Sequence, residues 1–242
     1  MSNADKIPVM EIFGPTIQGE GMVIGRKTMF VRTAGCDYQC VWCDSAFTWN
    51  GSEKERTRFM TPQEVVEELV RLGDRRFNHV TISGGNPALI DHPMQELIRL
   101  CHESGWKVGL ETQGSRSQPW FHEIDDLTVS PKPPSSKMTT NFEVLDSLVD
   151  NLKQHQVHFS LKIVIFDDAD LEYARQVFAR YPDVPQFLQV GNDRANDEGG
   201  IANHLLTRMN WLFEKVVGDP KLNHARVLPQ LHALVWGNER ER

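Results

Sequence analysis

The chain has 242 residues, of which 40% are hydrophobic and 24% charged, a composition typical of globular proteins. Its 33 acidic and 26 basic side chains give a formal net charge of −7, which argues against a nucleic-acid-binding surface. No stretch approaches the roughly 20 apolar residues of a membrane span, and Met1–Lys6 lacks the apolar core of a signal peptide. We therefore expect a cytoplasmic protein without a nucleic-acid or membrane partner.

Apolar periodicity predicts strands that alternate with helices along most of the chain. We expect an apolar run at 9–13, a glycine-rich loop at 14–21 and a strand at 28–32. After a charged loop at 50–58, the segment Thr61-Pro62-Gln63-Glu64 has the form of a helix capping box. Further strands are predicted at 79–83, 107–111, 126–130, 159–166, 186–190 and 225–228. Helical segments are predicted between them at 93–104, 120–124, 141–154, 168–180 and 200–217.

This alternation is the pattern of a parallel sheet with right-handed crossovers. Six or seven strand–helix units suit an incomplete α/β barrel of the (βα)6 type better than a closed barrel of eight. Because no linker interrupts the pattern, we expect residues 1–242 to form a single domain. The carboxyl ends of all strands in such a barrel open on one face, where an active site would lie. Unusual loops follow six of the predicted strands: the cysteine-rich loop after 28–32, and the segments 83–87, 111–114, 130–134, 189–192 and 228–232.

Three of the four cysteines fall within eight positions, in the pattern Cys36-x-x-x-Cys40-x-x-Cys43. Three thiolates so close in sequence can hold an iron–sulfur cluster or contribute to a zinc site. In a reducing compartment such a group favours metal binding over a disulfide framework. A four-iron cluster is usually held by four thiolates, so three would leave one iron open to a small molecule. Cys101 stands alone in an apolar helical pattern, and we expect it to be a buried helix residue.

The spacing of these cysteines, with Trp42 just before the last of them, resembles the cluster loop of the radical S-adenosylmethionine (SAM) superfamily. Members of that superfamily bind a [4Fe-4S] cluster through three cysteines and chelate its open iron with SAM. An electron from the cluster cleaves the sulfonium and yields a 5′-deoxyadenosyl radical, which abstracts a hydrogen from the substrate. The segment Ser83-Gly84-Gly85-Asn86-Pro87 resembles the Gly-Gly-Glu-Pro motif of the superfamily, with Asn86 in place of the usual Glu.

A narrower resemblance, to the 7-carboxy-7-deazaguanine synthases, covers nearly the whole chain. That family converts 6-carboxy-5,6,7,8-tetrahydropterin to 7-carboxy-7-deazaguanine with ring contraction and loss of ammonia, in the pathway to queuosine and related 7-deazapurines. The resemblance implies a carbon–nitrogen lyase that uses Mg2+ besides the cluster and SAM. It also implies a homodimer that receives electrons from a donor such as flavodoxin. The matching segments are Thr16-Ile17-Gln18-Gly19-Glu20-Gly21, Phe30-Val31-Arg32, Cys43-Asp44-Ser45, Glu111-Thr112-Gln113-Gly114 and Ser130-Pro131-Lys132.

The resemblance also implies a role for each matching residue, within a domain that has an N-terminal substrate loop and a C-terminal extension. The three clustered cysteines hold the [4Fe-4S] cluster, and the hydroxyl of Ser45, where the family usually has Thr, binds Mg2+. Arg32 suits the substrate carboxylate, because a guanidinium can bind it through two hydrogen bonds. The residues implied for SAM are Trp42, Cys43, Asp44, Gly85, Ser130, Pro131 and Lys132. The residues implied for the substrate are Ile17, Gln18, Gly19, Arg32, Ser83, Glu111 and Gln113.

Two other functions fit the cysteine loop. Another radical SAM enzyme, such as an activase of a glycyl radical enzyme, would keep the cluster and dock a large partner instead of a pterin. A zinc-binding protein without enzymatic activity would take a distant His or Asp as the fourth ligand, although zinc loops usually come as paired Cys-x-x-Cys or with paired His. Lys162 in mid-strand can face either way, and Gln230 and His232 could close the site. The sequence assigns no catalytic role to these residues or to Asn86.

Overall fold

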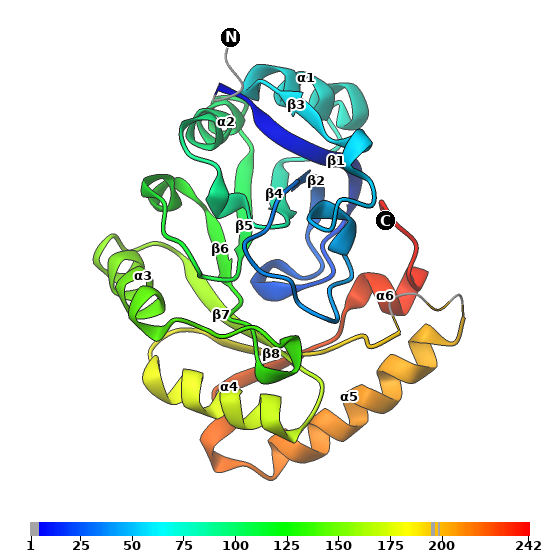
Figure 1. Ribbon diagram of the computed structural model, residues 1–242, viewed down its shortest axis with the longest axis vertical. Helices are drawn as coiled ribbons and strands as arrows, with labels where there is room; N and C mark the ends of the chain where they lie inside the picture. Colours follow the sequence, from blue (N-terminus) through cyan, green and yellow to red (C-terminus); the bar gives the residue numbers. More distant parts are fainter. Residues whose placement is uncertain (1–4, 195–196, 198) are drawn as a thin grey trace.

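The computed structural model describes residues 5–194, 197 and 199–242, and its strands form one curved sheet. The order of strands across the sheet is β3-β1-β2-β4-β5-β6-β7-β8-β9. Figure 1 shows the strands as an arc, with the large helices on its outer side. The strands are β1 Ile7–Ile17, β2 Lys27–Thr33, β3 Arg58–Met60, β4 His79–Gly84, β5 Lys107–Thr112, β6 Asp126–Val129, β7 Phe159–Ile165, β8 Gln186–Val190 and β9 Ala225–Leu228.

The sheet is parallel from β2 through β4 to β9, which confirms the predicted barrel architecture. The long strand β1 breaks this pattern, because it pairs antiparallel with β2 on one side and with the short strand β3 on the other. Strands β3 and β9 are the two edges of the sheet and do not pair with each other in the described part of the chain. The barrel is therefore incomplete, as the number of strand–helix units predicted.

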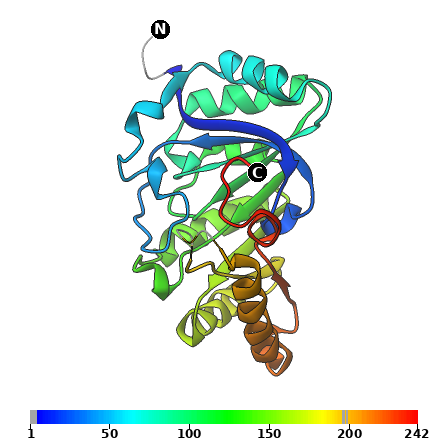
Figure 2. The same cartoon turned by 90° about the vertical axis from the view of Figure 1, so that its right-hand side faces the viewer.

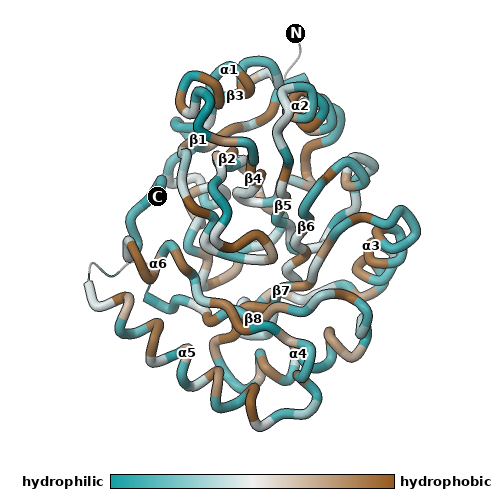
Figure 3. The backbone as a smooth tube through the Cα atoms, turned by 180° about the vertical axis from the view of Figure 1, so that it is seen from behind, coloured by the Kyte–Doolittle hydropathy of each residue, from teal (hydrophilic) through white to brown (hydrophobic). Residues whose placement is uncertain are grey.

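Six α-helices of the described residues accompany the sheet, and the buried faces of the larger ones fill the core outside the strands. Helix α1 begins with the predicted capping box: the Thr61 side chain accepts from the Glu64 backbone, and Glu64 Oε2 accepts from the Thr61 backbone at 2.6 Å. Cys101 is fully buried on α2, as expected. The tube in Figure 3 shows hydropathy alternating along α5. The helices are α1 Pro62–Gly73, α2 His92–Glu103, α3 Phe142–Gln154, α4 Asp168–Arg180, α5 Ile201–Val217 and α6 Leu231–Trp236.

Three local predictions were wrong. The loop predicted at 14–21 begins only after Ile17, because β1 continues through a register shift between Phe13 and Thr16. Such an irregularity accommodates a proline, which has no N–H for the ladder. Strand β3, which begins at the last residue of the loop predicted at 50–58, was missed because three residues are too few to show a strand pattern. Helix α6 was missed because its six residues span less than two helical turns.

Strand β2 connects the two ends of the barrel. It begins just after the tip of the β1–β2 hairpin and ends at the cysteine loop. Figure 2 shows the dark blue hairpin tip and the light blue cysteine loop toward opposite ends of the strands. In the parallel register with β4, Arg32 pairs with Ser83, so two predicted substrate residues from separate segments lie side by side. Among the described residues, no helix combines the length and the apolar character needed to cross a membrane.

Candidate active site

The loops at the carboxyl ends of the parallel strands surround one cavity. Its wall includes all three clustered cysteines and, with one exception, every residue predicted for SAM, substrate or Mg2+. The exception is Pro131, which is buried but does not line the cavity. The cavity is also lined by residues that were not predicted to bind SAM, substrate or metal, among them Glu20, Trp49, Lys162, Gln189, Gln230 and His232.

N–H groups from three segments point at the sulfurs of the cysteine loop. The backbone N–H of Tyr38 lies 3.4 Å from Cys36 Sγ, and the indole N–H of Trp49 lies 3.5 Å from Cys43 Sγ. Gln113 Nε2 is 3.7 Å from the same Cys36 sulfur. Hydrogen bonds to sulfur stabilise the thiolate form and tune the potential of a bound cluster. The prediction that Gln113 binds the substrate stays untested, but its amide contacts the cysteine loop.

The chemistry of these thiols suits a shared prosthetic group. Burial raises the pKa of Cys36, and it raises the pKa of Cys40 to about 11, while the nearby Lys132 ammonium opposes the rise in both. In the described part of the chain, no three His, Cys, Asp or Glu side chains converge as one metal ion would require. A four-iron cluster is a larger body, whose thiolate ligands bind separate corners. The three free cysteines around one cavity therefore fit a cluster with one open iron.

The double glycine after β4 is required by its packing on the cysteine loop. A Cβ at Gly85 would lie 1.9 Å from the carbonyl oxygen of Gly35, and Gly84 has a φ of +128°. The next residue, Asn86, donates its backbone N–H to that same Gly35 carbonyl. Only glycine permits this approach of two backbones, so the motif fixes the cysteine loop against the carboxyl end of β4.

Asn86 has a structural reason to differ from the superfamily's Glu. Its Nδ2 donates to Asp37 Oδ1 at 2.8 Å, and its Oδ1 accepts from Thr112 Oγ1 at 2.9 Å. Asp37 Oδ1 also accepts from Gln113 Nε2 at 2.7 Å. A glutamate at position 86 would face the carboxylate of Asp37, and like charges at this distance repel. The amide instead links the cysteine loop to β5.

Residues predicted for SAM and Mg2+ lie around the cysteines. Lys132 is half-buried, with its Nζ 3.3 Å from Ser130 Oγ, so it is not a solvated surface lysine. Trp42 Nε1 donates to Ser135 Oγ at 3.0 Å, which ties the cysteine loop to the segment after β6. Ser45 Oγ lies 3.7 Å from Cys43 Sγ. The hydroxyl is thus beside the Cys43 thiol and in the wall of the cavity.

Arg32 lies on the wall of the cavity between aromatic rings and a buried carboxylate. Its guanidinium carbon is 5.6 Å from the ring centroids of both Phe13 and Phe47. Its Nε is 3.3 Å from Glu11 Oε2, and Glu11 also forms an ion pair with Arg240 of the C-terminal segment. Rings and carboxylate fix a guanidinium that would otherwise be flexible.

A buried ion-pair triad lines another part of the cavity. Lys162 is 3% exposed and faces inward, with Nζ 2.6 Å from Glu20 Oε2 and 3.1 Å from Glu111 Oε2. Burial opposes the charges, but their mutual attraction keeps the pKa of Lys162 above and that of Glu20 well below the usual range. One cation and two anions leave a net negative charge. Glu111 Oε1 and both polar atoms of the Gln189 amide have no hydrogen-bond partner among the described residues.

The C-terminal segment contacts Gly19 and Glu20 of the β1–β2 hairpin. Gln230 Nε2 donates to Glu20 Oε1 at 2.9 Å, and the backbone N–H of Leu231 donates to the carbonyl of Gly19 at 2.9 Å. A Cβ at Gly19 would lie 2.2 Å from His232 Nδ1, so only glycine fits beneath this ring. These contacts join residues more than 200 positions apart, and no sequence pattern signals them.

Comparison with known sequences agrees with this geometry. A model of the radical SAM superfamily matches residues 30–178, which is most of the parallel sheet. The protein is 58% identical to a 7-carboxy-7-deazaguanine synthase of Bacillus subtilis over 98% of this chain and 99% of that one. It is 56% identical to a protein of the same name from Bacillus cereus over 97% of this chain and 98% of that one.

Solved structures show the same fold. The crystal structure of QueE from Escherichia coli matches with a TM-score of 0.66 over 94% of this chain and 95% of that one, at 22% identity. The structure of anSMEcpe with bound AdoMet and a Kp18Cys peptide matches with a TM-score of 0.54 over 83% of this chain and 63% of that one, at 16% identity. The chain therefore belongs to the radical SAM superfamily and, within it, to the 7-carboxy-7-deazaguanine synthase family.

Proposed function

We propose that the chain converts 6-carboxy-5,6,7,8-tetrahydropterin to 7-carboxy-7-deazaguanine and ammonia, in 7-deazapurine (queuosine) biosynthesis. The observation that carries the proposal is the composition of one cavity. Its wall has three thiols, an arginine fixed between rings and a carboxylate, and a buried anionic triad with free polar atoms. The 56% and 58% sequence identity to the two Bacillus synthases extends over nearly the whole chain, which supports the pterin substrate over the activase and zinc alternatives.

Cys36, Cys40 and Cys43 would hold the [4Fe-4S] cluster, and SAM would occupy the open iron. The chemistry that cluster and SAM supply together is one-electron cleavage of the sulfonium, which provides a radical able to abstract a hydrogen atom. Around them, the backbone at Gly85, which lines the cavity, would meet the methionine part of SAM, while the absence of a side chain lets Gly85 pack on the Gly35 backbone. The N–H groups aimed at Cys36 and Cys43 would favour their thiolate forms.

The charges of the cavity support one orientation of the pterin. Arg32 suits the substrate carboxylate, which needs a fixed cation that donates through two N–H groups. The free Glu111 Oε1 suits N–H donors of the amino-pyrimidinone ring, and the Gln189 amide can supply both a donor and an acceptor. Unpartnered buried polar atoms are costly, so a ligand that satisfies them gains affinity and specificity.

Three further parts of the proposal concern Mg2+ and partners. The hydroxyl of Ser45 would be one Mg2+ ligand, with substrate and water as the others, because Mg2+ keeps few protein ligands. An electron donor such as flavodoxin would reduce the cluster.

A homodimer is supported by the exposed apolar side chains of Leu206, Phe213 and Val217 on α5. The mass of the protein in solution tests this part of the proposal.

The decisive experiment is an anaerobic assay with protein, reductant, SAM and the carboxytetrahydropterin, with and without Mg2+. We expect 7-carboxy-7-deazaguanine and ammonia as products. SAM cleavage without consumption of the pterin would refute this substrate and would favour the activase alternative.

A substitution at Arg32 tests the orientation of the substrate in the same assay. We expect Arg32→Gln to raise KM for the pterin by about 10- to 100-fold, because a charge-assisted bidentate contact is lost. Slow SAM cleavage in the absence of substrate should persist. The matched control is Arg58→Gln of β3, whose guanidinium pairs with Glu68 outside the cavity, and it should leave KM unchanged. An unchanged KM in Arg32→Gln would remove this residue from the substrate site.

A further inference from the structure

The tip of the β1–β2 hairpin, residues 18–26, is a folded unit of its own. The backbone N–H of Gln18 donates to the carbonyl of Arg26 at 2.8 Å, and that of Gly25 donates to the carbonyl of Gln18 at 2.7 Å. The first three residues of the tip line the cavity, whereas Arg26 at its other end does not. The position of the tip therefore determines where Gln18, Gly19 and Glu20 meet a ligand.

One end of the tip is fixed inside the barrel. Glu20 forms its 2.6 Å ion pair with Lys162 of β7. At Gly21, where φ is +65°, a Cβ would lie 3.0 Å from Thr128 Oγ1 and 3.1 Å from Glu111 Oε1. The backbone of the tip thus packs closely on the inner side of β5 and β6. A shift of this segment by one ångström would break the ion pair or clash with the strands.

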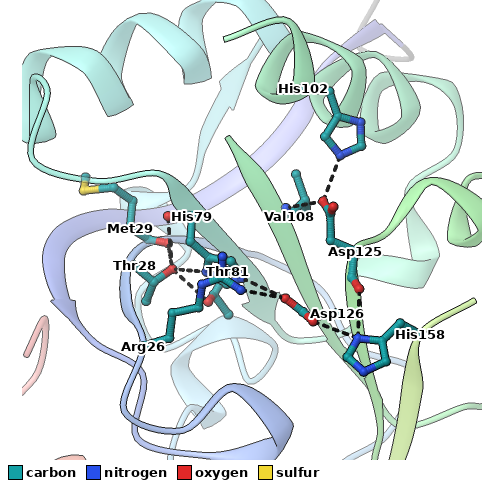
Figure 4. Close-up of polar contacts among 10 residues, drawn as sticks. All are labelled: Arg26, Thr28, Met29, His79, Thr81, His102, Val108, Asp125, Asp126 and His158. Atoms are coloured by element: carbon teal, nitrogen blue, oxygen red, sulfur yellow. Dashed lines mark hydrogen bonds and ion pairs between the residues drawn. The ribbon is translucent and has the colours of Figure 1, made fainter. Parts of the chain in front are cut away.

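The other end is fixed at the amino end of β6. Arg26 Nη1 is 2.9 Å from Asp126 Oδ2, with side-chain exposures of 31% and 11%. Figure 4 shows Asp126 between Arg26 on one side and His158 on the other, with His158 Nδ1 2.9 Å from Asp126 Oδ1. The carboxylate contacts Arg26 of the tip through one oxygen and the start of β7 through the other. It is held in place from outside the tip.

The buried side chain of His79 lies next to this carboxylate and contacts the buried side chain of Thr28. His79 Nε2 is 3.7 Å from Asp126 Oδ2, and its Nδ1 is 2.8 Å from Thr28 Oγ1. The imidazole is fully buried, and it lies over Gly109, where a Cβ would come within 2.9 Å of the ring. His79, His158 and Arg26 all act to hold the pKa of Asp126 below its usual value, so the carboxylate stays charged.

We propose that the Arg26–Asp126 ion pair is a positioning device for substrate binding, which fixes the hairpin tip from the end of the barrel opposite the cysteine loop. The inference rests on the proposed function, because Gln18 to Glu20 are the residues it places. According to this proposal, Asp126 and Arg26 do not contact the substrate themselves. They reduce the freedom of the tip before the substrate arrives, so less conformational entropy is lost on binding.

The test compares Asp126→Asn with Asp125→Asn. Asp125 is the adjacent residue, and Figure 4 shows its carboxylate bonded to His102 and to the Val108 backbone instead of the tip. We expect Asp126→Asn to raise KM for the carboxytetrahydropterin about fivefold with kcat changed less than about twofold, and Asp125→Asn to change neither. Iron content and SAM cleavage without substrate should stay at the level of the unaltered protein in both variants.

Hydrogen exchange gives a readout that needs no substrate. The amides of Gln18 and Gly25 should exchange about fivefold faster in Asp126→Asn only, because loss of the ion pair favours opening of the tip. Unchanged exchange of these amides would overturn the proposal even if the pterin proved to be the wrong substrate. Faster exchange with an unchanged KM would also overturn it, since the tip would then move without consequence for binding. A KM effect equal in both variants would indicate a general loss of stability.

Discussion

The parallel core and the segments that flank it contribute different halves of the cavity. The region matched by the superfamily model, residues 30–178, supplies the cysteines and the loops after β4, β5 and β6. The flanking segments supply Ile17 to Glu20 from the hairpin and Gln189, Gln230 and His232 from the C-terminal part. The core thus carries the chemistry shared by a superfamily, and the flanks carry much of the surface that would select a substrate.

The two halves meet at the Lys162 triad. Lys162 and Glu111 come from the core, whereas Glu20 comes from the hairpin tip. This ion-pair network is therefore both a structural joint and a wall of the cavity. Loss of a thiol of the cysteine loop should abolish all radical chemistry, and changes at the Lys162 triad should weaken the fold and the substrate site together. Changes at single substrate or Mg2+ ligands should have graded effects.

The largest effect is expected from the cysteines of the core. Cys40→Ala should lower turnover at least about a thousandfold, because the cluster loses a thiolate and SAM cleavage stops. Iron content, the visible absorption of the cluster and SAM cleavage measure this loss. Cys101→Ala is the matched control, since this cysteine is fully buried on α2 and remote from the cavity. If Cys40→Ala kept its iron and its activity, the assignment of the cluster ligands would be wrong.

At the joint, Lys162→Met should lower the free energy of unfolding by about 3–5 kcal/mol at neutral pH. The substitution leaves the Glu20 and Glu111 carboxylates in a buried site without their cation. Urea denaturation measures the loss, with folded protein verified by circular dichroism. Lys162→Met combined with Glu111→Gln should recover part of it, because one uncompensated charge is removed. A double variant less stable than Lys162→Met would contradict the electrostatic explanation.

The pH dependence of stability sharpens this prediction. Burial by itself would raise the pKa of Glu20, but Lys162 and His232 bring it well below its usual range. The ionised Glu20 therefore stabilises the fold above the ordinary pKa of about 4.3, and this contribution is lost as the pH falls. In Lys162→Met burial acts on Glu20 without the cation and favours a raised pKa, so protonation of Glu20 stabilises the fold. The difference in unfolding free energy between the two proteins should shrink as the pH falls from 7 to 4.

These contacts mark the limit of what sequence patterns could predict. Strands, helices and the cysteine loop follow from local periodicity and spacing, and the structure confirms most of them within one or two residues. The triad joins Lys162 to residues 142 and 51 positions away, and the curvature of the sheet alone brings them together. Asn86 and Gly19 show the same limit, because their partners Asp37 and His232 lie on other segments.

The smallest effect is expected at Ser45. Its hydroxyl would be one Mg2+ ligand among several, so Ser45→Ala should lower turnover about tenfold at limiting Mg2+ and little at saturating Mg2+. Ser45→Thr, which keeps the hydroxyl, should behave like the unaltered protein. Iron content should not change, because Ser45 lies beside Cys43 without being a thiolate ligand. The Mg2+ concentration for half-maximal turnover measures the effect. If that concentration were the same in Ser45→Ala, the hydroxyl would be no ligand, and metal selection would belong to the substrate and the flanking segments instead of the core.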